Sequence, residues 1–237
     1  MYWLDSYERT ARLTPGLLLL VPIAIVFVGF GFPLTPWSAT LAGLVLAVAG
    51  PVVLAKHVGN RGRSLEDTLY QSWGGPPTTL LLRPPAHGEL GPILAQRRSN
   101  VERASKVTLP DGSGPDHGAD AEVYKAAVLT IRSKTTDHAR FPLVFAENKS
   151  YGFERNLLGV KTEGLVASGV CVLGPAGALI LAILGPAPLD PTSLGLAFAA
   201  NTVILVFWTI WPTSKRVEDA GTRYAERLLD AASAVAE

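Results

Sequence analysis

Residues 13–55 read LTPGLLLLVPIAIVFVGFGFPLTPWSATLAGLVLAVAGPVVLA and contain no Asp, Glu, Lys, Arg or His. The hydrocarbon core of a bilayer is about 30 Å thick and is crossed by roughly 20 helical residues. This run of 43 uncharged residues is therefore long enough for two crossings. Pro33 and Pro36 would break a helix in the middle of the run, and the indole of Trp37 suits the headgroup layer. The run predicts a transmembrane hairpin with spans near residues 15–32 and 38–55.

Two further uncharged runs, residues 164–189 and 191–214, lie on either side of Asp190. The proline-rich sequence GPAPLDP separates them, so they predict a second hairpin with spans near residues 165–184 and 193–211. The three runs cover 93 of the 237 residues, and all 41 charged residues lie in the other 144. One part of the chain is thus suited to lipid and the other to water, which excludes a simple soluble enzyme.

Two alternatives for the first run are a buried helical core and a cleaved signal peptide. Core helices of soluble proteins are amphipathic, whereas residues 17–28 present no polar face. Arg9 and Arg12 precede the run as in a signal peptide, but the run is too long, and Asp5 and Glu8 dilute the positive charge. Both alternatives are therefore disfavoured.

Basic residues flank the four predicted spans on one side only. Neither hairpin turn contains Lys or Arg, and the basic flanks are Arg9, Arg12, Lys56, Arg61, Arg63, Arg155, Lys161, Lys215 and Arg216. Cytoplasmic flanks carry an excess of Lys and Arg, so both termini and residues 56–163 are expected in the cytosol. The Ala-, Gly- and Pro-rich composition fits a bacterium with GC-rich DNA, and we expect a multi-pass protein of the bacterial inner membrane.

The sequence predicts a mostly α-helical fold: a four-helix transmembrane protein of two hairpins, with a small, mainly helical cytosolic domain inserted between them and a C-terminal amphipathic helix. The predicted parts are an interfacial segment over residues 1–14, a first hairpin over 15–55, the cytosolic domain over 56–163, a second hairpin over 164–212 and a cytosolic helix over 213–237. A domain with so few elements is marginal alone, so we expect it to pack on the spans or on copies of itself.

Glycines and caps predict how the cytosolic domain begins. Gly59 and Gly62 lie among basic residues and predict a flexible exit from the second span. Ser64 is expected to cap a short helix that ends near Trp73. Apolar residues at helical spacing then predict a helix over residues 89–106.

The rest of the domain alternates helical and extended patterns. Residues 78–83 and 141–146 are branched and apolar enough for short extended segments, and a helix is expected from Asp120. The mixed aromatic, basic and apolar stretch 151–158 predicts an interfacial elbow, with a plain surface loop as the alternative. The apolar stripe of residues 215–237 is expected to pack on the domain or to mediate self-association.

No pattern typical of a metal or nucleophilic site is present in the sequence. The four histidines lie 21 to 30 residues apart, so no two share a helical face. Cys171 lies inside a predicted span, where a thiol behaves as a small apolar group. We expect no catalytic residue, no metal and no cofactor.

Candidate ligand residues are few. The sequence GGPP at residues 74–77 lacks the Lys-Ser/Thr of a nucleotide-binding loop, but with Trp73 and Arg83 it forms either a plain turn or a niche for a small ligand such as a nucleotide. Arg97 and Arg155 are candidates for contact with anionic headgroups, and an ordinary solvated face is the alternative. We expect no nucleic-acid partner.

Within the spans, Asn201 is the one strongly polar side chain, followed by Thr202. An interhelical hydrogen bond or the lining of a pore in an oligomer would explain it. Small residues such as Gly43 and Gly174, each followed by an alanine four residues later, permit close helix approach.

These features favour a non-enzymatic, self-associating membrane protein that forms a signal-gated pore or otherwise perturbs the bilayer. The layout is similar to that of small bacterial membrane effectors used in anti-phage defence, which implies a cytosolic sensing module and spans that oligomerise. The alternative is a membrane-anchored scaffold or receptor whose cytosolic domain recruits a protein partner. An enzyme acting on lipid would depend on Glu147, Glu154 or Asn156.

Overall fold

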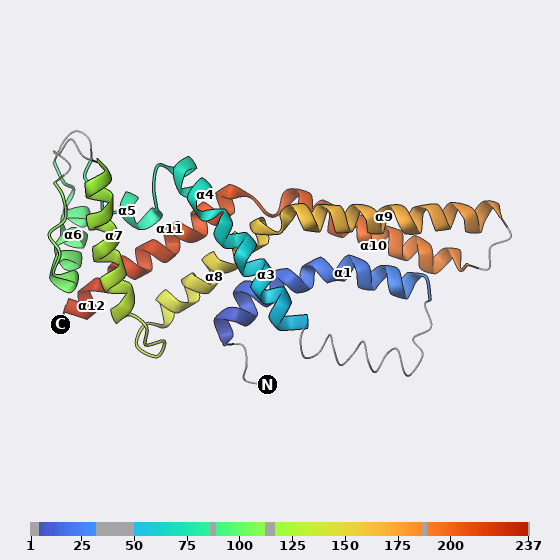
Figure 1. Ribbon diagram of the computed structural model, residues 1–237, viewed down its shortest axis with the longest axis horizontal. Coiled ribbons are helices and arrows are strands. Elements are labelled where there is room, and N and C mark those ends of the chain that lie inside the picture. Colours follow the sequence, from blue (N-terminus) through green and yellow to red (C-terminus); the bar gives the residue numbers. More distant parts are fainter. Residues whose placement is uncertain (1–4, 32–49, 86–88, 112–116, 186–188, 237) are drawn as a thin grey trace. The chain divides into compact units, whose positions relative to one another are not determined.

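The computed structural model describes residues 5–31, 50–85, 89–111, 117–185 and 189–236. All regular elements within these ranges are helices, and none is a strand (Figure 1). They group into two compact units, each built from two stretches of chain. Unit 1 comprises Met1–Leu65 and Gly152–Ser214, and unit 2 comprises Glu66–Tyr151 and Lys215–Glu237.

Three helices of unit 1 are long and apolar enough to cross a membrane. The first runs over Glu8–Gly29 and consists of a π-helical segment, Glu8–Leu13, continued by α1, Thr14–Gly29. The others are α9, Lys161–Leu184, and α10, Pro191–Ile210, which lie side by side in Figure 1. The prediction of a membrane protein is confirmed to this extent, with three of the four predicted spans found as such helices.

The second predicted span falls mostly on residues 32–49, which lie outside the described residues. Its last part, from Gly50, belongs to α3, which continues to Ser64. The predicted flexible exit at Gly59 and Gly62 is therefore wrong, because both glycines are helical. Ser64 does not cap the following helix either: its hydroxyl donates to the Arg61 carbonyl 2.8 Å away, at the end of α3.

Glycines in unit 1 mark where helices touch. A Cβ on Gly159 would lie 2.6 Å from the Gly62 nitrogen and 2.8 Å from its Cα. A Cβ on Gly164 would overlap the Trp208 ring, and one on Gly29 would lie 2.5 Å from the Ala197 Cβ. These positions hold glycine because the neighbouring helix occupies the space of a side chain.

The core of unit 1 lies at one end of the long helices. Its buried members come from the first span, α3, α8, the N-cap of α9 and α10: Leu19, Val58, Leu157, Val160 and Trp208. Lys161 donates from Nζ to the Thr209 and Pro212 carbonyls at 3.1 and 3.0 Å, which satisfies acceptors left at the end of α10. At its other end α10 is capped by Asp190, whose pKa is lowered by hydrogen bonds from the Ser193 side chain and from backbone amides.

Unit 2 is built from α4 (Glu66–Trp73), α5 (Pro77–Leu80), α6 (Pro92–Ser105), α7 (His117–Lys134), α11 (Ser214–Asp230) and α12 (Ala232–Ala236). It also includes the part of α8 (Pro142–Gly159) that ends at Tyr151. Its core joins Val101, Tyr124 and Ile131 to Leu228 and Leu229. The apolar stripe of the C-terminal helix therefore packs within unit 2, the first of the two alternatives considered for it.

Three predicted segments of unit 2 have a different conformation. Residues 78–83 are not extended: Pro77 occupies the first turn of α5, where its fixed φ favours a helix. Residues 142–146 belong to α8, which also begins at a proline; Phe141 immediately before the helix and Val144 within it are both buried in the core of unit 2. The predicted elbow at 151–158 is wrong, since these residues form the continuous second half of α8.

Candidate functional site

A small pocket in unit 2 begins at the turn that follows α4. The Gly75 amide donates to the Tyr70 carbonyl at 2.8 Å, so the chain reverses immediately after the helix. Gly74 and Gly75 have φ of +82° and +142°, a region that favours glycine. The reversal directs Pro76, Pro77 and Thr78 into the wall of the pocket.

Tyrosines from three helices form the aromatic part of the pocket. Tyr70 lies on α4, Tyr151 on α8 and Tyr224 on α11. The rings of Tyr151 and Tyr224 are nearly parallel, with an angle of 4° and centroids 6.2 Å apart. The Tyr70 and Tyr151 hydroxyl oxygens are 3.1 Å apart, and Tyr151 donates to Glu66 Oε1 at 3.3 Å. This network fixes the orientation of Tyr70 and Tyr151.

Gly221 and Arg132 complete the pocket. A Cβ on Gly221 would lie 3.3 Å from both Pro77 and Tyr151, so glycine lets α11 approach these walls closely. Arg132 of α7 is exposed and is the one charged side chain among the eleven lining residues. The pocket has a volume of about 140 Å³.

The predicted ligand niche lies beside this pocket rather than in it. The Trp73 ring lies 5.8 Å from that of Tyr70, and Arg83 Nη2 lies 3.8 Å from the Cβ position of Gly75. Neither Trp73 nor Arg83 lines the pocket. The predicted glycine turn is adjacent to the pocket, whereas the sequence pattern did not predict Tyr70, Tyr151, Tyr224 or Arg132 as ligand residues. Tyrosines on otherwise apolar helix faces were the available signal, because a buried Tyr hydroxyl needs a polar partner.

The two other arginine candidates are engaged within their units. Arg97 donates from Nη2 to Asp230 Oδ1 at 3.3 Å. Arg155 is only 8% exposed, and its Nη2 lies 3.4 Å from Asn156 Oδ1. Asn156 is itself fully buried and donates to the Ala11 carbonyl at 2.7 Å. These contacts give Arg155 and Asn156 packing roles inside unit 1.

The membrane candidates have contrasting environments. Asn201 is fully buried and donates from Nδ2 to the Ala197 carbonyl of its own helix at 3.0 Å, while its Oδ1 has no hydrogen-bond partner among the described residues. Thr202 donates to the Phe198 carbonyl at 2.8 Å. Gly174 is exposed, with open space where a Cβ would be. Gly43 lies outside the described residues.

Among the uncharged side chains of unit 1, two further buried polar atoms lack partners within the described chain. They are Ser168 Oγ on α9 and Trp208 Nε1 on α10, and both side chains are completely buried. With Asn201 Oδ1 they form the unpartnered polar group of unit 1. The predicted interhelical hydrogen bond of Asn201 is not among its described contacts.

An ion cluster lies where α3 and α9 meet. Glu163 Oε1 accepts from Arg61 Nε at 2.6 Å, and His57 Nε2 lies 3.8 Å from the same oxygen. Glu163 follows Lys161 at the start of α9, before the uncharged part of that helix. The cluster therefore places charge only at the polar end of the span.

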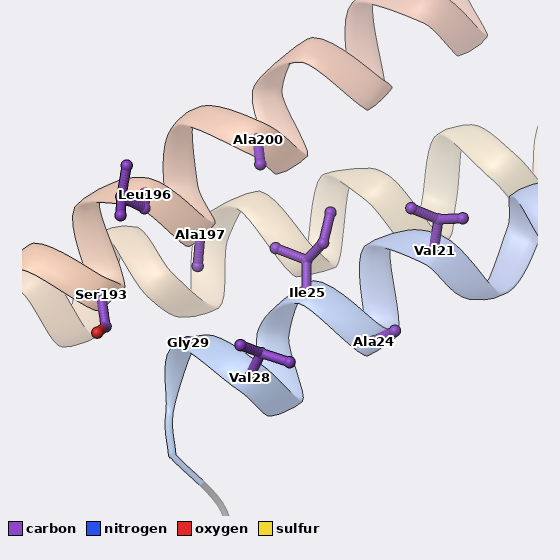
Figure 2. A pocket seen from close by; sticks show the side chains of 9 residues that line it. All are labelled: Val21, Ala24, Ile25, Val28, Gly29, Ser193, Leu196, Ala197 and Ala200. Atoms are coloured by element: carbon purple, nitrogen blue, oxygen red, sulfur yellow. The ribbon is translucent and has the colours of Figure 1, made fainter.

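A groove of about 430 Å³ runs between α1 and α10. Figure 2 shows its lining, in which Val21, Ile25 and Val28 come from α1, and Leu196 and Ala197 come from α10. Ser193 contributes the one polar side chain. The groove has hydrocarbon walls and offers no group for acid–base or metal chemistry.

No group of three or more His, Cys, Asp and Glu side chains suited to a metal ion occurs in the described part of the chain. Comparison with known protein families, curated proteins and solved structures finds no significant match. The function of this protein is therefore inferred from the geometry of the two units.

Proposed function

We propose that this protein is a non-enzymatic, self-associating protein of the bacterial inner membrane that permeabilises the bilayer when unit 2 receives a cytosolic signal. The proposal assigns the bilayer to the long apolar helices and sensing to unit 2. It is supported by the three candidate spans and by the separate core and pocket of unit 2. The basic flanks of the spans support a cytosolic unit 2.

The observation that carries the proposal is the unpartnered polar group of unit 1. In a hydrocarbon environment, a polar atom without a hydrogen bond costs several kcal/mol. Asn201 Oδ1, Ser168 Oγ and Trp208 Nε1 bear this cost in the described arrangement. Water entering between separated spans would hydrogen-bond to all three atoms, so these atoms favour a second, hydrated arrangement of the same helices.

Self-association is supported by glycines that the packing of one chain does not explain. Gly174 and Gly177 are exposed on α9, and open space lies where their Cβ atoms would be. Small residues let transmembrane helices approach one another closely. Gly177 also lies in an exposed stripe at alternating spacings of four and three residues, the pattern of helix–helix seams. The other members of the stripe are Val166, Val170, Leu173, Ile180 and Leu184.

Replacing Asn201 with leucine should stabilise the closed arrangement and reduce permeation. The substitution removes the buried carbonyl oxygen that lacks a partner, so the thermal midpoint in detergent is expected to rise. Release of a self-quenched dye from reconstituted phospholipid vesicles is expected to fall about tenfold, which corresponds to about 1.4 kcal/mol. Release is measured over a series of protein-to-lipid ratios.

Thr202→Val is the matched control, because the Thr202 hydroxyl already bonds to its own helix. This variant should release dye as the wild-type chain does. If the wild-type chain releases no dye at any ratio, the permeabilising function is wrong and the scaffold alternative is favoured. If N201L and T202V behave alike, the unpartnered polar group has no part in permeation.

Replacing Gly177 with leucine should weaken self-association about tenfold, because a bulky side chain would separate the α9 helices of two copies. Energy transfer between labelled chains in vesicles, followed on dilution with lipid, measures the effect. Gly195→Leu on α10 is the control, since its Cβ also meets open space but lies outside the α9 stripe. Equal effects of the two variants would contradict the proposed seam.

A further inference from the structure

We propose that the pocket of unit 2 binds an organic anion built on a single six-membered ring. The inference rests on the proposed sensing function and names the class of its ligand. The pocket volume is about 140 Å³. An engineered cavity of about 150 Å³ in another protein takes one benzene ring. A single ring therefore fits, whereas the fused rings of a purine exceed the space.

The walls of the pocket suit the faces and edges of a ring. Tyr224 offers an aromatic surface held parallel to Tyr151, and stacking on such a surface is favourable for any planar ring. Pro76 and Pro77 form an apolar wall beside it. The hydrogen bonds from Tyr151 to Glu66 and between Tyr70 and Tyr151 hold the aromatic part in place.

Arg132 is the reason that we expect the ligand to carry a negative charge. It is exposed, lines the pocket, and makes no ion pair with a carboxylate in the described part of the chain. Arg98, by contrast, is buried and donates to three carbonyls. A guanidinium beside an aromatic pocket matches a phosphate or carboxylate attached to the ring. Thr78 adds a hydroxyl to the same lining.

The test is calorimetric titration of the full chain in detergent with four probes. Phenyl phosphate carries a benzene ring and uridine monophosphate carries a single-ring base, each with a phosphate; adenosine monophosphate carries the same ribose phosphate on a fused-ring base, and inorganic phosphate carries the anion alone. At least one of the two single-ring anions should bind, and which one binds best separates a nucleotide from another aromatic acid. Adenosine monophosphate and inorganic phosphate should bind at least tenfold more weakly.

Arg132→Gln should weaken binding of the single-ring anion about tenfold or more, because it removes a charge-assisted hydrogen bond. Lys125→Gln is the matched control, since Lys125 is an exposed cation on the same helix that does not line the pocket. The inference is overturned if neither single-ring probe binds at millimolar concentration, if adenosine monophosphate binds equally well, or if R132Q binds like K125Q.

Binding and permeation are measured separately, so the two proposals can fail independently. Ring-anion binding without dye release under any condition would leave the assigned ligand class standing and contradict the permeabilising function. Dye release from a chain that binds no single-ring anion would do the reverse.

Discussion

Replacing Gly159 with alanine is expected to lower the stability of unit 1 by about 3 kcal/mol. The added Cβ would lie 2.6 to 2.8 Å from backbone atoms of Arg61 and Gly62. Backbone atoms in a helix cannot rotate away as a side chain can, so α3 and α8 would have to separate. A loss of this size corresponds to a fall of roughly 6–12 °C in the thermal midpoint, which circular dichroism in detergent measures.

Gly174→Ala is the control for this variant. Its Cβ would meet open space, and alanine is the better helix former by about 1 kcal/mol, so its midpoint should stay the same or rise slightly. If G159A and G174A melt at the same temperature, the close approach of α3 and α8 does not stabilise unit 1.

Replacing Arg98 with alanine is expected to destabilise unit 2 by about 3–5 kcal/mol. The Arg98 side chain is 7% exposed, and its Nη1 donates to the Leu82 carbonyl at 2.6 Å. Its Nη2 donates to the carbonyls of Pro110 at 2.6 Å and Leu109 at 3.3 Å. One guanidinium thus holds the chain after α5 and the chain after α6, and its loss leaves buried acceptors unsatisfied.

Amide hydrogen exchange across α6 and α7 measures this effect within unit 2. Exchange should accelerate at least a hundredfold in R98A, and R98K should restore little of the protection, because an ammonium cannot reproduce the planar fork. Arg97→Ala is the neighbouring control: Arg97 is partly exposed, and its surface pair with the exposed Asp230 is worth no more than about 1 kcal/mol. Equal exchange in R97A and R98A would refute the structural role assigned to Arg98.

The spans were the most predictable part of the fold. Long runs without charge identify helices for lipid from composition alone, and α9 and α10 begin and end within a few residues of the predicted limits. The conformation of residues 56–64 was not predictable, because glycines among polar residues favour a loop. Gly59 and Gly62 are helical because α3 packs closely on its neighbours, and a local pattern carries no information about those contacts.

Two segments predicted to be extended are helical, and in both a proline lies at the start of the helix. Short apolar stretches next to Pro77 and Pro142 resemble strands, yet each proline occupies the first turn of a helix.

The sequence predicted only part of the pocket lining. The glycine turn was visible in the sequence, but Tyr70, Arg132, Tyr151 and Tyr224 lie on four helices and become neighbours only in the folded unit.

The division of unit 2 into two stretches of chain has a consequence for its biosynthesis. Within unit 2, residues 66–151 leave the ribosome before residues 215–237, but the core of the unit includes Leu228 and Leu229. At about 5–20 residues per second, roughly 4–15 s pass between the translation of Tyr151 and that of Leu228. During that interval α9 and α10 are translated, and the nascent unit exposes the apolar surface that α11 later covers. Chaperone binding to translation intermediates should therefore peak before residue 228 emerges.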